Sequence, residues 1–111
     1  MELWEITEEK VVAAVKKIVE ASNPVSIIIF GSYARRQLGP NSDLDVMVVV
    51  NDKVINCRAE SVRIRKALRG ISMPMDIIVV RRRDLNKFAD APGLIYASAI
   101  REGKVVYEKA A

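Results

Sequence analysis

The sequence contains no histidine and only one cysteine, Cys57, and these two absences remove whole classes of chemistry. Without an imidazole there is no serine or cysteine triad with a histidine base, and no histidine-ligated zinc or haem iron. One thiol can neither close an internal disulfide nor build a thiolate metal cage. Catalysis by these residues would therefore depend on carboxylates, hydroxyl groups, arginine and lysine, with Mg²⁺ as the natural metal.

Two further features are scarce, namely long apolar runs and aromatic side chains. No apolar run approaches the roughly 20 residues that span a bilayer, and the acidic start MELWE is unlike a signal peptide. We therefore expect a cytoplasmic protein without a membrane partner. Aromatic residues make up 5% of the chain, so no series of stacking side chains interleaves with the basic residues, and nucleic-acid binding is the less favoured interpretation of them.

What the sequence does contain is the composition of one globular domain over residues 1–111. Half of the residues are apolar and 29% are charged, whereas disordered chains have fewer apolar residues and more one-sided charge. Eighteen Lys and Arg against fourteen Asp and Glu leave a net charge of +4, which suits a polyanionic partner without requiring one. The basic clusters at 58–69 and 81–83 are predicted to form a solvated face or a partner contact.

Apolar periodicity predicts helices that alternate with short buried strands. Thr7 is a candidate N-cap, and Asn23-Pro24 is expected to end the first helix. In the helix over 57–69, Val62 and Leu68 are predicted to point inward. Further helices are expected at 33–37, from about residue 84, and at 92–102, with strands at 25–30, 43–50, 75–80 and 105–107 and a turn at 38–42.

This order predicts a small α/β or α+β sheet with helices mainly on one face. The strands at 43–50 and 75–80 could be parallel, because a helix connects them. The short turn before residue 43 leaves the relation between the first two strands open.

Gly31-Ser32 lies where a strand passes into a short helix. Such a junction offers unpaired backbone N–H groups and a hydroxyl, which suit phosphate oxygens, and glycine lets a phosphate approach the backbone closely. A Gly-Ser pair at a turn is common, however, and by itself says little.

Three aspartates are candidates for metal binding. Asp43 and Asp45 are two residues apart on a strand, so their side chains are expected on the same face. By itself, this pair is equally explained by a turn aspartate and an Asp–Arg ion pair. Asp76, however, interrupts a third apolar strand, and beside Asp45 it would complete a three-carboxylate cluster. Such clusters hold Mg²⁺ or Mn²⁺ for in-line attack on phosphorus, and one carboxylate can accept the proton of the attacking hydroxyl.

The sequence resembles the minimal nucleotidyltransferases of the DNA polymerase beta-like superfamily. The resemblance rests on Gly31-Ser32, a ten-residue gap, Asp43-Leu44-Asp45 and the lone Asp76, within the string GSYARRQLGPNSDLDVMVVV. It covers residues 25–80 strongly and IREGKVVY over 100–107 more loosely. It implies a nucleotidyltransferase fold, which is an α+β two-layer structure with a small mixed sheet.

The resemblance also implies roles for individual residues. Gly31 and Ser32 would hold the β- and γ-phosphates of a nucleoside triphosphate, and Arg35 would touch phosphate or stabilise the helix of the motif. Arg36 stands where family members usually carry glycine, so it either adds a phosphate contact or perturbs the loop. Two Mg²⁺ ions, or Mn²⁺, would bind to three carboxylates, those of Asp43, Asp45 and Asp76.

The implied reaction transfers a nucleoside monophosphate, AMP from ATP in the expected case, to an acceptor hydroxyl. Larger superfamily members carry a second domain for the acceptor, so here the acceptor must come from a partner or from another copy of the chain. In the family, such partners are often HEPN-domain toxins, which the minimal protein counteracts as an antitoxin and in some cases adenylylates. A catalytically weak, partner-binding antitoxin and a nucleic-acid-binding module are the alternatives.

Overall fold

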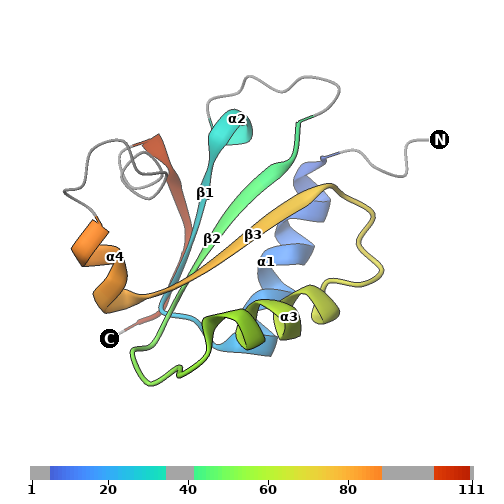
Figure 1. The fold of residues 1–111 in the computed structure, drawn as a ribbon. Helices are drawn as coiled ribbons and strands as arrows, with labels where there is room; N and C mark the ends of the chain where they lie inside the picture. The colour runs from blue at the N-terminus through green and yellow to red at the C-terminus, as the bar shows by residue number, and fades with distance from the viewer. Residues whose placement is uncertain (1–5, 35–41, 89–101, 111) are drawn as a thin grey trace.

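The computed structural model describes residues 6–34, 42–88 and 102–110, and within these ranges helices and strands alternate along the chain (Figure 1). Because apolar segments of helical and strand periodicity alternate in the sequence, this order is the one that their patterns predict. The elements are α1 (Glu8–Ser22), β1 (Ser26–Phe30), α2 (Gly31–Ala34), β2 (Leu44–Val50), α3 (Cys57–Ala67), β3 (Met75–Arg81), α4 (Arg82–Phe88) and β4 (Lys104–Glu108).

The four strands form one mixed sheet in the order β3-β2-β1-β4. β1 is antiparallel to both β2 and β4, whereas β2 and β3 are parallel and connected across α3. The parallel pair is the predicted one, and the relation between the first two strands, which the sequence left open, is antiparallel. The α+β class with a small mixed sheet is thus confirmed.

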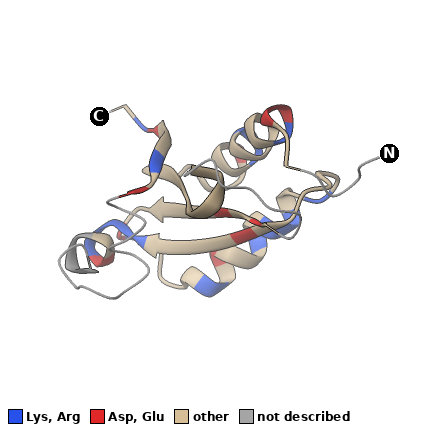
Figure 2. Cartoon of the chain, turned by 90° about the horizontal axis from the view of Figure 1, so that it is seen from above, with Lys and Arg blue, Asp and Glu red and all other residues tan. Residues whose placement is uncertain are grey.

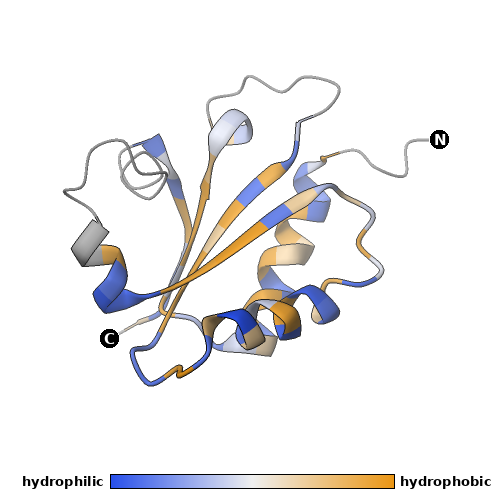
Figure 3. Ribbon diagram, viewed as in Figure 1, coloured by the Kyte–Doolittle hydropathy of each residue, from blue (hydrophilic) through white to orange (hydrophobic). Residues whose placement is uncertain are grey.

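Side chains of alternating residues divide the core into two parts. On one face, α1 and α3 cover the sheet, and their fully buried Ile18 and Ile64 pack with Val46 and Val48 of β2 (Figures 1 and 3). The opposite face carries a smaller cluster that includes Met47, Val49, Phe30, Val80 and Leu85. Among the described residues, the main helical layer therefore lies on one side of the sheet, as predicted.

Both ends of α1 are those that the sequence predicts. The hydroxyl oxygen of Thr7 accepts a hydrogen bond from the backbone N–H of Lys10 at 3.2 Å, as an N-cap does. Asn23 adopts the left-handed conformation with φ of 49°, and its N–H donates to the carbonyl of Val19 at 2.9 Å.

Three sequence-based predictions of local structure need correction. Val62 is 48% exposed, and Ile64 with Leu68 forms the buried stripe of α3 instead, because a residue two positions away lies on the opposite side of a helix. α2 begins at Gly31 instead of residue 33, and α4 begins at Arg82 instead of residue 84. The predicted helix at 92–102 and most of the turn at 38–42 fall outside the described residues.

The basic run over 81–83 is not uniformly a solvated face. Arg81 is half-buried, and its guanidinium group donates to the carbonyl of Val54 at 2.6 Å and to that of Ile55 at 2.5 Å. It also forms an ion pair with Asp84 at 3.3 Å. Through these hydrogen bonds Arg81 connects the segment before α3 to the end of β3. In the parts of the chain that the structure describes, no helix combines the length and apolarity needed to cross a membrane.

Candidate active site

Two of the three predicted aspartates lie side by side in the sheet. Asp45 of β2 and Asp76 of β3 are partners in the parallel register, and neighbouring strands run about 4.8 Å apart. Strand alternation puts Asp45 on the same face as Met47, and Asp76 on the same face as Val80. Both carboxylates therefore lie on the face opposite α1 and α3, and Figure 2 shows acidic segments on two adjacent strands.

Asp43 lies just outside this pair. It is exposed and precedes β2, whose first residue, Leu44, donates from its N–H to the carbonyl of Pro74 at 2.8 Å. That bond extends the β2–β3 pairing and holds Asp43 next to the start of β3. Asp43 also lines a cavity at the end of α3.

Gly31 and Asp45 are in close contact. Phe30, the residue before Gly31, pairs with Asp45 across the antiparallel strands. Gly31 has φ of +74°, and a Cβ atom on it would lie 2.1 Å from Oδ2 of Asp45. Glycine suits this position, because a side chain would be strained by the backbone conformation and would displace the carboxylate.

The predicted phosphate-binding residues are only partly described. Ser32 is half-buried and directly follows Gly31 in α2. It is therefore adjacent in the chain to the residue that contacts Asp45. Arg35 and Arg36 lie outside the described residues.

Arg65 is a site neighbour that the sequence interpretation missed. Its Nη2 lies 4.0 Å from Oδ1 of Asp76 and donates to the carbonyl of Ile77 at 3.2 Å. The guanidinium group therefore sits at the free edge of β3, beside the carboxylate. In the sequence Arg65 is one of several basic residues at helical spacing, and nothing distinguishes it from Lys66 or Arg69.

The residue types suit hard divalent cations, since every candidate ligand is a carboxylate. Among the described residues, no three acidic, histidine or cysteine side chains converge tightly enough to form a metal site as they stand. Asp43 is exposed, and the Asp76 side chain is 58% exposed, so both can rotate about their side-chain bonds. If these side chains rotated toward Asp45, the three carboxylates would be ligands of the type that Mg²⁺ and Mn²⁺ prefer.

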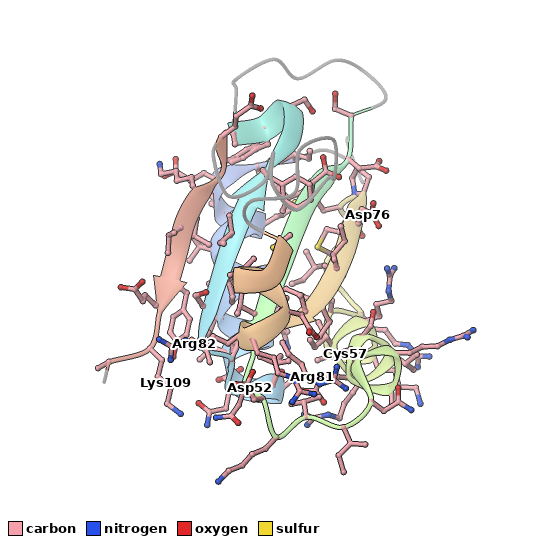
Figure 4. The ribbon with its side chains drawn as sticks, turned by 60° about the vertical axis from the view of Figure 1, so that its left-hand side comes forward. Asp52, Cys57, Asp76, Arg81, Arg82 and Lys109 are labelled. Carbon is pink, nitrogen blue, oxygen red and sulfur yellow. The ribbon has the colours of Figure 1, made fainter. Side chains whose placement is uncertain are left out.

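The basic run over 81–83 is remote from these carboxylates. Asp76 is the second residue of β3 and Arg81 the last, and at about 3.3 Å per residue this separates them by roughly 16 Å. Figure 4 shows Arg81, Arg82 and Asp52 together at the opposite end of the molecule from Asp76.

Comparison with known families shows the family of the chain. Residues 13–111 match the model of the family described as polymerase beta, nucleotidyltransferase. The chain belongs to this nucleotidyltransferase family. No curated protein matches the sequence significantly.

Solved structures share the nucleotidyltransferase fold. A candidate nucleotidyltransferase from Sulfolobus solfataricus superposes with a TM-score of 0.63 at 17% sequence identity, covering 91% of this chain and 79% of that one. A chain from a toxin-antitoxin structure with AMP-PNP superposes with a TM-score of 0.54 at 20% identity, covering 94% and 75%. At these identities the likeness shows the shared fold.

Proposed function

We propose that this nucleotidyltransferase transfers the nucleoside monophosphate of an NTP, with ATP as the expected donor, to a hydroxyl group on a partner protein. The observation that carries the proposal is the position of Asp45, which lies beside Asp76 in the β2–β3 register and next to Gly31 through the β1–β2 pairing. Paired carboxylates adjoining a glycine that tolerates close approach suit a metal-bound triphosphate.

In this proposal the nucleotide lies at the end of the sheet where Gly31, Asp45 and Asp76 come together. The backbone at Gly31 and the hydroxyl of Ser32 bind the β- and γ-phosphates. Asp43 and Asp45 turn toward the phosphates, and together with Asp76 they would hold two Mg²⁺ ions, for which Mn²⁺ can substitute. These ions, when bound, neutralise the charge of the triphosphate.

In this proposal the Asp76 carboxylate also accepts the proton of the acceptor hydroxyl. The oxygen of the acceptor hydroxyl forms a bond to the α-phosphorus, and the bond from that phosphorus to the oxygen bridging to the β-phosphorus breaks. Pyrophosphate leaves with that oxygen, and the hydroxyl proton passes to the Asp76 carboxylate. A carboxylate can do this work in a chain without histidine.

The acceptor comes from outside the chain in this account. The family domain matches residues 13–111. One of the similar chains is part of a toxin-antitoxin structure with AMP-PNP, which supports a protein partner and an adenine nucleotide. A HEPN-type toxin is the partner that the sequence resemblance suggests.

A second candidate is a partner-binding antitoxin with weak catalysis. It is supported by the orientation of the three aspartates, whose side chains do not converge among the described residues. In that case partner binding alone would neutralise the toxin, and substitution of an aspartate would leave neutralisation intact.

The test is incubation of the protein with α-³²P-labelled ATP, Mg²⁺ and the product of the neighbouring gene. We expect label on the partner with the wild type and none with Asp43→Asn or Asp45→Asn. Asp52→Asn is the matched control, because Asp52 is an exposed aspartate at the opposite end of the molecule. Equal labelling by the wild type and both site variants would refute the proposal, and neutralisation without labelling would favour the second candidate.

A further inference from the structure

A cavity of about 560 Å³ opens at the free edge of β3, beside the candidate active site. Its charged lining residues are Asp43, Arg65 and Arg69, and Ser72 is also polar. Asp43 belongs to the proposed catalytic set and lines the cavity directly, whereas Asp76 is linked to the cavity only through Arg65, whose Nη2 lies 4.0 Å from Oδ1 of Asp76. The rest of its lining is mainly apolar and includes Leu68, Met73 and Ile77.

The two arginines differ in how they are held. Arg65 donates to the carbonyl of Ile77 at 3.2 Å and to the hydroxyl of Ser61 at 3.4 Å, which fixes its guanidinium group at the strand edge. Arg69 is exposed and has neither an ion pair nor a side-chain hydrogen bond with any residue that the structure describes. A guanidinium group without a partner at the rim of a cavity is free to bind a carboxylate in a bidentate manner.

We propose that this cavity binds an acidic peptide segment of the acceptor protein, with Arg65 and Arg69 as its specificity-determining residues. The apolar lining would take an aliphatic side chain of the segment while the arginines pair with its acidic groups. This inference rests on the proposed function, since the acceptor hydroxyl would have to reach Asp76, the residue that takes its proton, from the bound segment around the edge of β3, where Arg65 lies 4.0 Å from the Asp76 carboxylate.

The lining favours a peptide over a nucleic acid. No aromatic residue is among those that line the cavity within the described chain, so bases would have no stacking platform there. Aliphatic side chains next to arginine are instead typical of a site for a segment with both acidic and apolar residues. The net charge of +4 further favours an acidic partner.

Fluorescence anisotropy without any nucleotide tests this proposal separately from catalysis. The probes are fluorescein-labelled peptides of the sequence AEELYLEA and the same peptide with every Glu replaced by Gln or by Lys. We expect the acidic peptide to bind about tenfold more tightly than the Gln peptide, and the double variant Arg65→Gln/Arg69→Gln to remove that difference. Arg65→Glu/Arg69→Glu should then prefer the Lys peptide.

Lys66→Gln is the matched control, because Lys66 is exposed near the end of α3, lies between the two arginines in the sequence and does not line the cavity. Circular dichroism checks folding, and the single variant Arg69→Gln, which breaks no contact among the described residues, tests the proposal even if a double variant unfolds. Its affinity for the acidic peptide should fall about threefold.

Equal binding of the three peptides by the wild type, or an equal loss in Lys66→Gln and Arg69→Gln, would overturn the proposal. The proposal would be overturned in favour of RNA binding if a labelled octauridylate displaced the acidic peptide and if Arg69→Gln abolished octauridylate binding. Failure of AMP transfer with charge-dependent peptide binding intact would refute the proposed catalysis and leave the cavity's specificity standing.

Discussion

The carboxylate of Asp45 occupies the space that a side chain on Gly31 would need. A Cβ atom there would lie 2.1 Å from Oδ2 and 3.0 Å from Cγ of Asp45. The start of α2 and the middle aspartate of the candidate site are therefore in direct contact, and the geometry of one depends on the identity of the other.

Gly31→Ala should affect activity far more than stability. The added methyl group has to displace the Asp45 carboxylate, which is the mobile end of a side chain, so the cost in folding is mainly the left-handed backbone, about 1 kcal/mol. A displaced catalytic group typically costs about a hundredfold in rate. Urea unfolding and the rate of label transfer from ATP measure the two effects.

Gly70→Ala is the control that separates these effects. Gly70 has φ of +96°, and a Cβ atom on it would meet nothing within 4 Å. Both variants carry the same kind of backbone strain, but only Gly31→Ala disturbs Asp45. Equal activities for the two variants would show that the Gly31–Asp45 contact has no part in catalysis.

Transfer should require a divalent cation. Treatment with EDTA should abolish labelling by the wild type, and Mg²⁺ or Mn²⁺ should restore it, because carboxylates are the ligands that these ions prefer. Asp45→Asn should not recover at any concentration of either ion. Transfer that persists in EDTA would contradict metal-dependent chemistry at these aspartates.

Arg81 should matter for stability and not for transfer. Arg81→Gln loses two charge-assisted hydrogen bonds, to the carbonyls of Val54 and Ile55, which predicts a decrease of about 2 kcal/mol in the free energy of unfolding. Arg82→Gln is the matched control, since Arg82 is exposed and should change this energy by less than about 0.5 kcal/mol. Equal unfolding midpoints for the two variants in urea would refute the structural role of Arg81.

Glu60 should make stability depend on pH in the acid range. Burial alone would raise its pKa, but hydrogen bonds from Ser22 and Arg63 and the charge of Arg63 outweigh burial, so its pKa lies below the ordinary 4.5. The Ser22 hydroxyl joins α1 to Glu60 of α3 at 2.5 Å, and Arg63 lies 2.6 Å from the same carboxylate. The Glu60 carboxylate therefore stabilises the packing of α1 against α3.

This contribution is fully present above pH 4.5 and is lost as pH falls through the lowered pKa in the folded protein. Glu60→Gln should therefore be less stable than the wild type by about 1 kcal/mol at pH 7. The difference should shrink below about pH 4.5, where the wild-type carboxylate becomes protonated. Urea unfolding at several pH values measures it, and a difference that is independent of pH would argue against the charged contact.

The fold was largely predictable because its signals are local. Apolar periodicity predicts the helices and strands, and Thr7 and Asn23 mark the two ends of α1. The helix between β2 and β3 predicts that these two strands are parallel. The antiparallel pairing of β1 with β2 follows only from packing. Val62 was misplaced because α3 carries few apolar residues, and its inward side is decided by contact with α1 and the sheet.

The proximity of Asp45 and Asp76 was predictable from the sequence, whereas other contacts around the candidate site were not. Asp45 and Asp76 interrupt apolar strands, which made them visible in the sequence, and the register makes them neighbours. The position of Arg65 depends on how α3 lies along the edge of β3, which no sequence spacing encodes. Likewise, the contact of Gly31 with Asp45 arises from the antiparallel pairing of two strands.

A crystal structure of the protein with Mn²⁺ and a non-hydrolysable ATP analogue tests the central claim most directly. We predict anomalous manganese density bound by Asp43 and Asp45, with Asp76 as a further ligand and the triphosphate against Gly31-Ser32. Manganese and the analogue bound elsewhere on the molecule, with the three aspartates unengaged, would contradict this account.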